Sequence, residues 1–168
     1  GEHRKAQHHM DHINTFFDVL NMQYVAITTK PKLECNERHE LLDLAETLPH
    51  QNPAYRPGQC IILCDRGYES YRVLLELNRM GYSFIIRSPA KIAKAIASSK
   101  GLTVPMGKEN TDVTLTIKLR KEKDGTYKIS ASGKWRTKTD VMLNIRLVAH
   151  KLPNGEMEYL LTNIPKKK

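Results

Sequence analysis

The apolar positions of the first 60 residues predict a hairpin followed by a helix. Residues 12–30 hold two runs rich in Phe, Val, Tyr, Ile and Thr, joined near residues 20–22, which is typical of two antiparallel strands. Asn36 can cap a helix after them, because leucines at positions 41, 42, 44 and 48 fall on one helical face. Three prolines and one glycine in residues 48–58 then predict a loop.

The middle of the chain has the pattern of a β–α–β unit. Residues 59–64, QCIILC, are an apolar run bounded by turn signals, which indicates a strand buried on both faces. We expect a helix over residues 68–80, ended by Gly81, and a second strand over residues 82–88. Because a connection of this length must cross over, the two strands are expected to be parallel neighbours. Residues 89–99 favour a short basic helix.

From residue 113 onward the pattern changes to strict alternation. Apolar residues occupy every second position over residues 113–119 and again over residues 141–149. Asp124–Gly125 and Asn154–Gly155 are strong hairpin turn signals. Residues 113–164 therefore predict an antiparallel β unit.

These patterns together predict an α/β protein with a core over residues 1–100, an antiparallel insertion over residues 101–165 and a basic tail over residues 166–168. A chain of 168 residues is long enough for one domain with a small insertion. No run approaches the roughly 20 apolar residues of a membrane helix. The 3 cysteines lack CxxC spacing, so we interpret them as apolar fillers and expect a cytoplasmic protein.

Charge is distributed unevenly along the chain. Residues 1–100 carry 13 Lys and Arg against 11 Asp and Glu, whereas residues 101–168 carry 14 against 7. A basic segment favours a polyanionic partner, most often nucleic acid. The alternative is a solvated basic surface without a partner.

The most informative single residue is Asp65, which directly follows the apolar run of residues 59–64. In open α/β sheets, ligands bind at the carboxyl ends of the strands, where this carboxylate is expected to lie. Gly67 would allow a tight turn there. A carboxylate in this position suits Mg²⁺ or Mn²⁺, and the alternative is that Asp65 caps the helix that follows.

Residues 64–88, CDRGYESYRVLLELNRMGYSFIIRS, resemble the second catalytic block of the DDE transposases of bacterial insertion sequences, of the kind with a β-rich insertion. In that family a strand–Asp–Arg–Gly segment leads into a helix and then into a strand that ends in Arg. Residues 12–44 resemble the segment before this block, and residues 158–165 resemble the strand that closes the insertion. The resemblance implies a partial ribonuclease H-like mixed sheet with flanking helices, an antiparallel β insertion, and metal-dependent DNA cleavage and strand transfer.

The resemblance also implies roles for individual residues. Asp65 corresponds to the second Asp of the acidic triad and would bind Mg²⁺ or Mn²⁺, while Arg66 and Arg87 become candidate DNA-binding residues. The first Asp and the final Glu of the triad have no counterpart in these 168 residues, so we expect this chain alone to be inactive. Asp18 is not expected to replace them. The implied partner is DNA at the transposon ends, with no membrane and no small-molecule substrate.

Residues 133–138, GKWRTK, add a second candidate DNA contact. Trp135 can stack on an unpaired base while Lys134 and Arg136 hold phosphates. The alternative is that Trp135 packs the β unit against the rest of the protein. Near the N-terminus, three histidines lie close together in sequence: His8, His9 and His12. We interpret them as part of an exposed polar terminus, because no further residues with metal-ligand spacing accompany them.

Two other functions stay open at this point. The chain is either a non-catalytic DNA-binding or assembly remnant of a transposase, or an unrelated α/β protein in which Asp65 is only a cap. A ribonuclease H-like sheet without its first strand would expose a strand edge of a kind that is normally buried. Such an edge invites pairing with another chain, so self-association is a further expectation.

Overall fold

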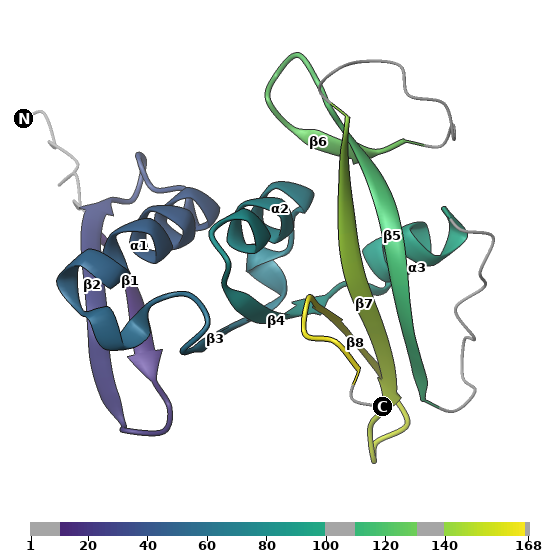
Figure 1. Ribbon diagram of the computed structural model, residues 1–168. Helices are drawn as coiled ribbons and strands as arrows, with labels where there is room; N and C mark the ends of the chain where they lie inside the picture. The colour runs from purple at the N-terminus through teal and green to yellow at the C-terminus, as the bar shows by residue number, and fades with distance from the viewer. Residues whose placement is uncertain (1–10, 100–109, 131–139, 167–168) are drawn as a thin grey trace, which may run out of the picture. The chain divides into compact units, whose positions relative to one another are not determined.

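The computed structural model describes residues 11–99, 110–130 and 140–166, and the chain divides into two compact units, residues 1–55 and 56–168 (Figure 1). Within the described residues the protein is mixed α/β, with a two-stranded sheet in the first unit and a six-stranded mixed sheet in the second. The predicted α/β class is therefore confirmed. None of the helices described here combines the length and the apolar character needed to cross a membrane.

The first unit is a β-hairpin with a helix on one face. Strands β1 (Asp11–Asp18) and β2 (Gln23–Pro31) pair antiparallel, as predicted. The register shifts after Phe16, which pairs with Ala26, whereas Phe17 pairs with Tyr24. The extra residue, Val25, packs with Phe16 against a small core that contains Ala26. The bulge thus turns an additional apolar side chain toward the core.

Helix α1 (Glu37–Gln51) begins where the sequence predicted, because the side chain of Asn36 accepts hydrogen bonds from the backbone N–H groups of Arg38 and His39. The end of the helix differs from the prediction. Residues 48–51 are helical rather than part of a loop, and Pro49 lies inside the last turn. Leu48 is 3% exposed and packs in the core of the unit, so tertiary packing holds this turn despite the proline. The 3₁₀-helix η1 (Pro53–Tyr55) ends the unit.

The second unit opens with the predicted β–α–β arrangement. Strands β3 (Ile61–Cys64) and β4 (Ser83–Ser88) are parallel neighbours, and α2 (Tyr71–Arg79) connects them. The carboxyl ends of the two strands therefore lie side by side at one end of the sheet. This pairing confirms the expectation from the length of the connection.

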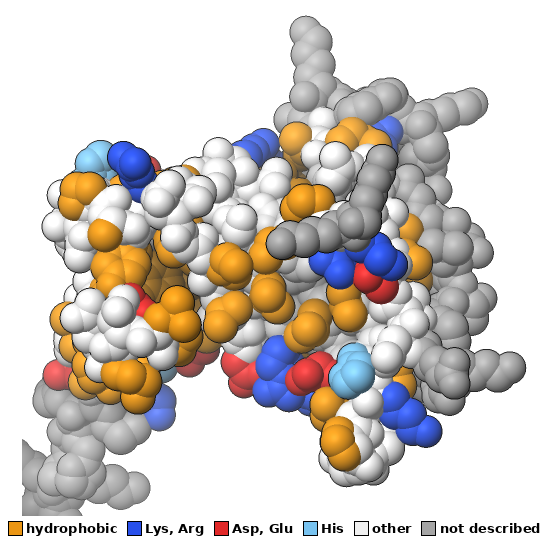
Figure 2. Space-filling model, turned by 60° about the horizontal axis from the view of Figure 1, so that its bottom comes forward, with side chains coloured by type: hydrophobic (Ala, Val, Ile, Leu, Met, Phe, Trp, Pro, Cys, Tyr) orange, Lys and Arg blue, Asp and Glu red, His pale blue; other side chains and the backbone are white. Residues whose placement is uncertain are grey.

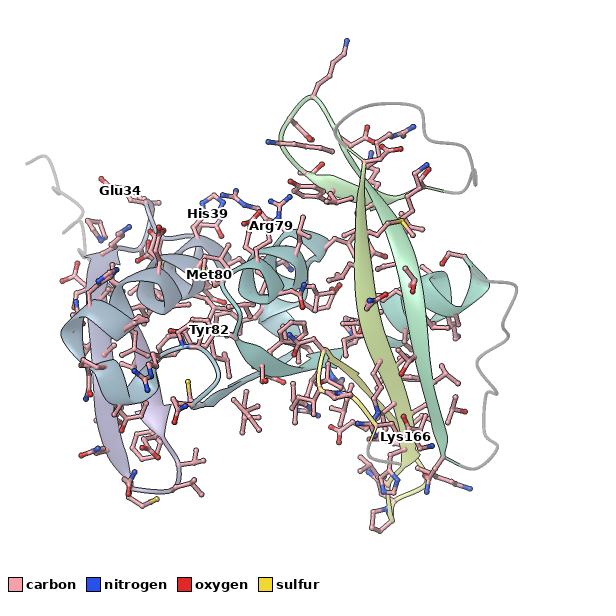
Figure 3. All side chains as sticks on the ribbon, in the orientation of Figure 1. Glu34, His39, Arg79, Met80, Tyr82 and Lys166 are labelled. Atoms are coloured by element: carbon pink, nitrogen blue, oxygen red, sulfur yellow. The ribbon has the colours of Figure 1, made fainter. Side chains whose placement is uncertain are left out.

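Helix α2 starts later than the sequence predicted. The 3₁₀-helix η2 (Arg66–Tyr68) comes first, and Ser70 then caps α2 by accepting a hydrogen bond from the N–H of Val73 at 3.1 Å. Glu69 therefore precedes the helix instead of lying in its first turn, and it is 7% exposed. The predicted end is confirmed: Gly81 has φ +83°, and the following N–H of Tyr82 donates to the carbonyl of Leu77 at 3.0 Å. Tyr82 leads directly into β4 (Figure 3).

The strands after α3 (Ala90–Ser98) join the same sheet as β3 and β4. They are β5 (Thr111–Lys121), β6 (Tyr127–Ile129), β7 (Val141–Lys151) and β8 (Met157–Thr162). All their pairings are antiparallel, and the order across the sheet is β3-β4-β8-β7-β5-β6. The predicted antiparallel unit is confirmed, with both Gly125 and Gly155 at positive φ in its turns.

The last strand connects the two halves of this sheet. Strand β8 pairs with β4 on one side and with β7 on the other. Residues on both sides of position 100 therefore share one sheet, and the compact units divide at Tyr55–Arg56 instead of near residue 100. The sequence did not indicate this pairing because strand order depends on contacts between distant segments.

Strand β3 lies at one edge of the six-stranded sheet. Ile62 is 8% exposed, whereas Ile61 is 52% and Leu63 59% exposed. The prediction that this strand is buried on both faces was therefore wrong. An apolar strand of the kind usually found inside a sheet thus occupies an edge position, and among the described strands it pairs with β4 alone.

Candidate functional site

The candidate site is built around the carboxyl end of β3. Asp65 follows Cys64 directly and has extended backbone angles, φ −80° and ψ 175°, before η2 begins. Its side chain makes no capping hydrogen bond to η2 and is 68% exposed. Gly67 is not among the described glycines with positive φ, so the turn here does not depend on glycine. The alternative that Asp65 is a helix cap is therefore wrong.

The carboxylate of Asp65 contacts Arg87 instead. Because Cys64 and Ile86 are register partners in the parallel pair, the next residue of each strand lies at the same end of the sheet. Arg87 donates from Nη1 to Oδ1 of Asp65 at 3.0 Å. The sequence singled out both residues, and the structure brings them together.

A third residue completes this group. Arg87 also donates from Nε to Oε1 of Glu158 at 2.8 Å. Glu158 comes from β8, the other neighbour of β4, and its side chain is 23% exposed. We call Asp65, Arg87 and Glu158 the charged cluster, which has two carboxylates for one guanidinium. Sequence reasoning missed Glu158, because only the order of the strands places it beside Arg87.

The fit of this cluster to a divalent metal ion is poor. A Mg²⁺ or Mn²⁺ ion takes about six oxygen ligands, whereas Asp65 supplies one carboxylate, of which one oxygen already accepts a hydrogen bond from Arg87. Among the described residues, no three His, Cys, Asp or Glu side chains gather into a group that could hold a metal. Burial raises the pKa of the neighbouring Cys64 thiol to about 12.

The other acidic candidate from the sequence has a structural role. Asp18 closes the turn of the hairpin by accepting hydrogen bonds from the N–H groups of Leu20 and Asn21 at 2.9 and 3.0 Å. Its other oxygen accepts from the hydroxyl of Tyr55 at 2.7 Å. The hydrogen bonds from Tyr55 and Asn21 lower the pKa of Asp18 to about 2. This hydrogen bonding accounts for Asp18 without a metal.

The remaining sequence candidates divide between the described and the undescribed parts of the chain. Arg66 is exposed and next to Asp65. Lys134, Trp135 and Arg136 lie outside the described residues, as do His8 and His9. In the same N-terminal group, His12 lies 3.5 Å from a carboxylate oxygen of Glu37.

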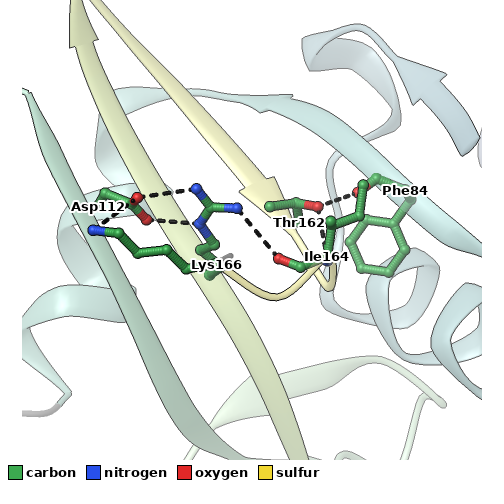
Figure 4. A network of polar contacts seen from close by, with 6 residues as sticks. Phe84, Asp112, Thr162, Ile164 and Lys166 are labelled. Carbon is green, nitrogen blue, oxygen red and sulfur yellow. Dashed lines mark hydrogen bonds and ion pairs between the residues drawn. The ribbon is translucent and has the colours of Figure 1, made fainter. Parts of the chain in front are cut away.

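Much of the basic character of the C-terminal third is neutralised where it is described. Asp112 binds Arg146 with two hydrogen bonds, at 2.6 and 2.9 Å, and Lys166 lies 3.2 Å from the same carboxylate (Figure 4). Lys118, 8% exposed, pairs with Asp140 at 3.1 Å. On the face shown in Figure 2, Lys and Arg side chains lie beside Asp and Glu side chains. Of the 14 basic residues in this third, 6 belong to undescribed segments.

The chain was compared with protein-family models and with curated protein sequences. A scan against protein-family models finds no match for this chain, and a search of curated protein sequences finds none.

Proposed function

We propose that this chain is part of the catalytic domain of a DDE transposase of the insertion-sequence kind, with a ribonuclease H-like fold. The observation that carries the proposal is the contact between Asp65 and Arg87 at the ends of two adjacent parallel strands. The two residues close the strand–Asp–Arg–Gly–helix–strand–Arg order that gives the sequence its resemblance to that family. Ligands of open α/β sheets bind at this end of the strands.

In this proposal Asp65 is one of three carboxylates that together hold Mg²⁺ or Mn²⁺. The ions would stabilise the attacking and leaving oxygens of an in-line phosphoryl displacement. Arg66, which is exposed beside Asp65, would contact a DNA phosphate, and Arg87, which donates a hydrogen bond to Asp65, would set the orientation of its carboxylate. Because this sequence matches only one residue of the triad, the chain alone is expected to catalyse neither cleavage nor strand transfer.

The proposal requires binding to DNA through phosphates. Each phosphate that a Lys or Arg neutralises contributes about −0.9 to the slope of log K against log salt for duplex DNA. Replacing Lys134 and Arg136 together by Ala is therefore expected to reduce that slope by about 2. Trp135→Ala is expected to weaken binding to single-stranded DNA by about 1–3 kcal/mol while leaving the slope unchanged.

Fluorescence anisotropy with labelled DNA across a salt series tests these expectations. Arg79→Gln is a matched control, because Arg79 is 48% exposed, pairs with Glu76 and is not among the residues assigned to DNA. Weak binding with no salt dependence would contradict the nucleic-acid function. Mn²⁺-supported cleavage by this chain that disappears in Asp65→Ala would contradict the expected inactivity.

A non-catalytic DNA-binding or assembly module is the second candidate, and the exposed apolar edge at β3 favours it. Pairing of this edge with a second chain would cover Ile61 and Leu63. Leu63→Lys is expected to abolish concentration-dependent association in analytical ultracentrifugation. Met142→Lys serves as the control, because Met142 is 45% exposed on β7, an interior strand. A monomeric wild-type chain at all concentrations would argue against assembly through β3.

A further inference from the structure

We propose that Cys35 is a modification site, at which a peroxide oxidises the thiol to a sulfenic acid whose hydroxyl donates a hydrogen bond to Asn14. Both residues belong to the first unit: Asn14 lies on β1, and Cys35 directly precedes the N-cap of α1. The inference goes beyond the proposed function and does not depend on it.

The turn between β2 and α1 positions the thiol (Figure 1). In this turn the N–H of Cys35 donates to the carbonyl of Lys32 at 3.4 Å, and Asn36 then caps the helix. The backbone is therefore held on both sides of the cysteine. Cys35 is partly exposed. Partial exposure is typical of cysteines that small oxidants modify, whereas cysteines buried in apolar surroundings are inert.

The amide of Asn14 faces the same sulfur and supplies the second observation. Asn14 is 5% exposed, and its Nδ2 donates to Sγ of Cys35 at 3.5 Å. Its Oδ1 is buried and has no hydrogen-bond partner within the described part of the chain. An acceptor in that position costs free energy in the folded state unless a donor reaches it. The Asn14 side chain thus provides an acceptor for a donor group next to the sulfur.

The neighbouring donors are already bound to another acceptor. Thr28, the register partner of Asn14, donates its hydroxyl to Oε2 of Glu40 at 3.3 Å. The ammonium of Lys30 pairs with the other oxygen of Glu40. A thiol is a weak donor, whereas the hydroxyl of a sulfenic acid is a stronger donor that stands one bond beyond the sulfur. Oxidation of Cys35 therefore places a donor beside the buried oxygen of Asn14.

The oxidation step balances with a peroxide as the oxidant. The thiolate sulfur attacks one peroxide oxygen, so that an S–O bond forms and the O–O bond breaks. The sulfur is oxidised, the peroxide is reduced, and the leaving hydroxide takes up the proton that the thiol released. Lys30 is near enough to interact with the sulfur: its pKa is raised mainly by the hydrogen bond to Glu40, and the charge of Cys35 acts in the same direction. Its ammonium stabilises the negative charge on the leaving oxygen.

The other two cysteines are poorer nucleophiles. Burial raises the pKa of Cys64 to about 12 and also raises the pKa of Cys60. A protonated thiol reacts slowly with oxidants, so both are expected to be modified later than Cys35. In sequence, Cys35 is the only cysteine of residues 1–55, so no second thiol of this unit converts the sulfenic acid to a disulfide.

Mass spectrometry of the purified chain, treated with hydrogen peroxide and then with dimedone, locates the oxygen, because dimedone labels sulfenic acids. The set comprises the wild type, Cys35→Ser, Asn14→Ala and the control Asn21→Ala, which removes the same amide from the exposed turn of the hairpin. We expect Cys35 to gain one oxygen several-fold faster than Cys60 and Cys64, and Cys35→Ser to lose the label. In Asn14→Ala the labelled fraction is expected to fall several-fold in favour of the sulfinic acid, because the hydroxyl has lost its acceptor.

Circular dichroism checks that each variant is folded. If Asn14→Ala does not fold, Asn14→Leu keeps the volume of the side chain without its polar atoms and is expected to give the same result. Early single oxidation of Cys35 in the wild type and Asn21→Ala, shifted to the sulfinic acid when Asn14 is replaced, supports the inference. Oxidation of Cys35 no faster than that of Cys60 and Cys64 overturns it. If Cys35 is oxidised first but gives the same products without Asn14, the hydrogen bond to Asn14 is wrong and the inference fails.

Discussion

The junction between β8 and β4 combines backbone strand pairing with hydrogen bonds of one amide side chain, that of Asn163. Its Oδ1 accepts from the N–H of Phe84 at 3.1 Å, and its Nδ2 donates to the carbonyl of Tyr82 at 2.8 Å and to Oδ1 of Asn78 at 3.2 Å. Tyr82 and Phe84 are 1% and 0% exposed. Asn163→Ala therefore leaves two backbone groups of buried residues without their partner, and each such loss costs about 1–3 kcal/mol.

We expect Asn163→Ala to lower the free energy of unfolding by about 2–4 kcal/mol, because water can reach these partly buried groups and recover part of the loss. In urea this corresponds to a shift of the midpoint of roughly 1–2 M at an unchanged slope. Asn154→Ala is the control: Asn154 makes similar hydrogen bonds to Glu156, but in an exposed turn. Its cost is expected to stay below about 1 kcal/mol.

Asn163→Asp separates the hydrogen bonds from the volume of the side chain. An ionised carboxylate still accepts from Phe84 but faces the oxygens of Tyr82 and Asn78 without a proton to donate. The folded state thus favours the protonated form, so its pKa is raised, and the destabilisation is present at neutral pH and is relieved as the pH falls through that pKa. This account of the junction would be refuted if Asn163→Ala and Asn154→Ala lowered the free energy of unfolding equally. It would also be refuted if the destabilisation by Asn163→Asp were not relieved at acidic pH.

Three further substitutions test the second unit. The hydrogen bonds from Arg146 lower the pKa of Asp112 to about 2 from its ordinary value of 3.8. The ionised Asp112 therefore contributes its full stabilisation above pH 3.8, and this stabilisation is lost as the pH falls through about 2. In Asp112→Asn the melting temperature is expected to change less with pH over that interval. Asp140→Ala breaks the ion pair with the buried ammonium of Lys118 and should lower the free energy of unfolding in urea by about 3–5 kcal/mol, whereas a loss below about 1 kcal/mol would contradict the pairing. Ser70→Ala removes the cap of α2 and should cost about 1 kcal/mol, with hydrogen exchange faster in the first turn of α2 than elsewhere.

Elements with a strong local pattern could be predicted from the sequence. The hairpin, the parallel β–α–β unit and the two turns at Gly125 and Gly155 follow from apolar periodicity and turn residues that act within a few positions. The errors lie where tertiary packing overrides local preference. Leu48 in the core keeps the last turn of α1 helical beyond Pro49, and η2 delays the start of α2.

Two of the three residues of the charged cluster could be predicted from the sequence. Asp65 and Arg87 are 22 positions apart, and the β–α–β pattern alone places them at the same end of neighbouring parallel strands. Glu158 lies 71 positions from Arg87, and its place depends on β8 pairing with β4. In sequence it is one of two acidic residues, Glu156 and Glu158, that follow the turn at Gly155, with nothing to distinguish it. A long-range strand pairing carries no local signal, which is why this partner was missed.

Under the proposed function, the number of carboxylates beside Asp65 would decide whether it binds a metal ion or stays paired with Arg87. With Asp65 and Glu158 alone, a single guanidinium neutralises half of the negative charge and bonds to both residues, so a hydrated divalent ion gains little by replacing it. In the proposed triad two more carboxylates would stand beside Asp65 and would raise the negative charge to about −3. Arg87 cannot neutralise that charge, whereas a divalent ion with several oxygen ligands can. In the proposed function, metal binding therefore depends on how many carboxylates stand beside Asp65.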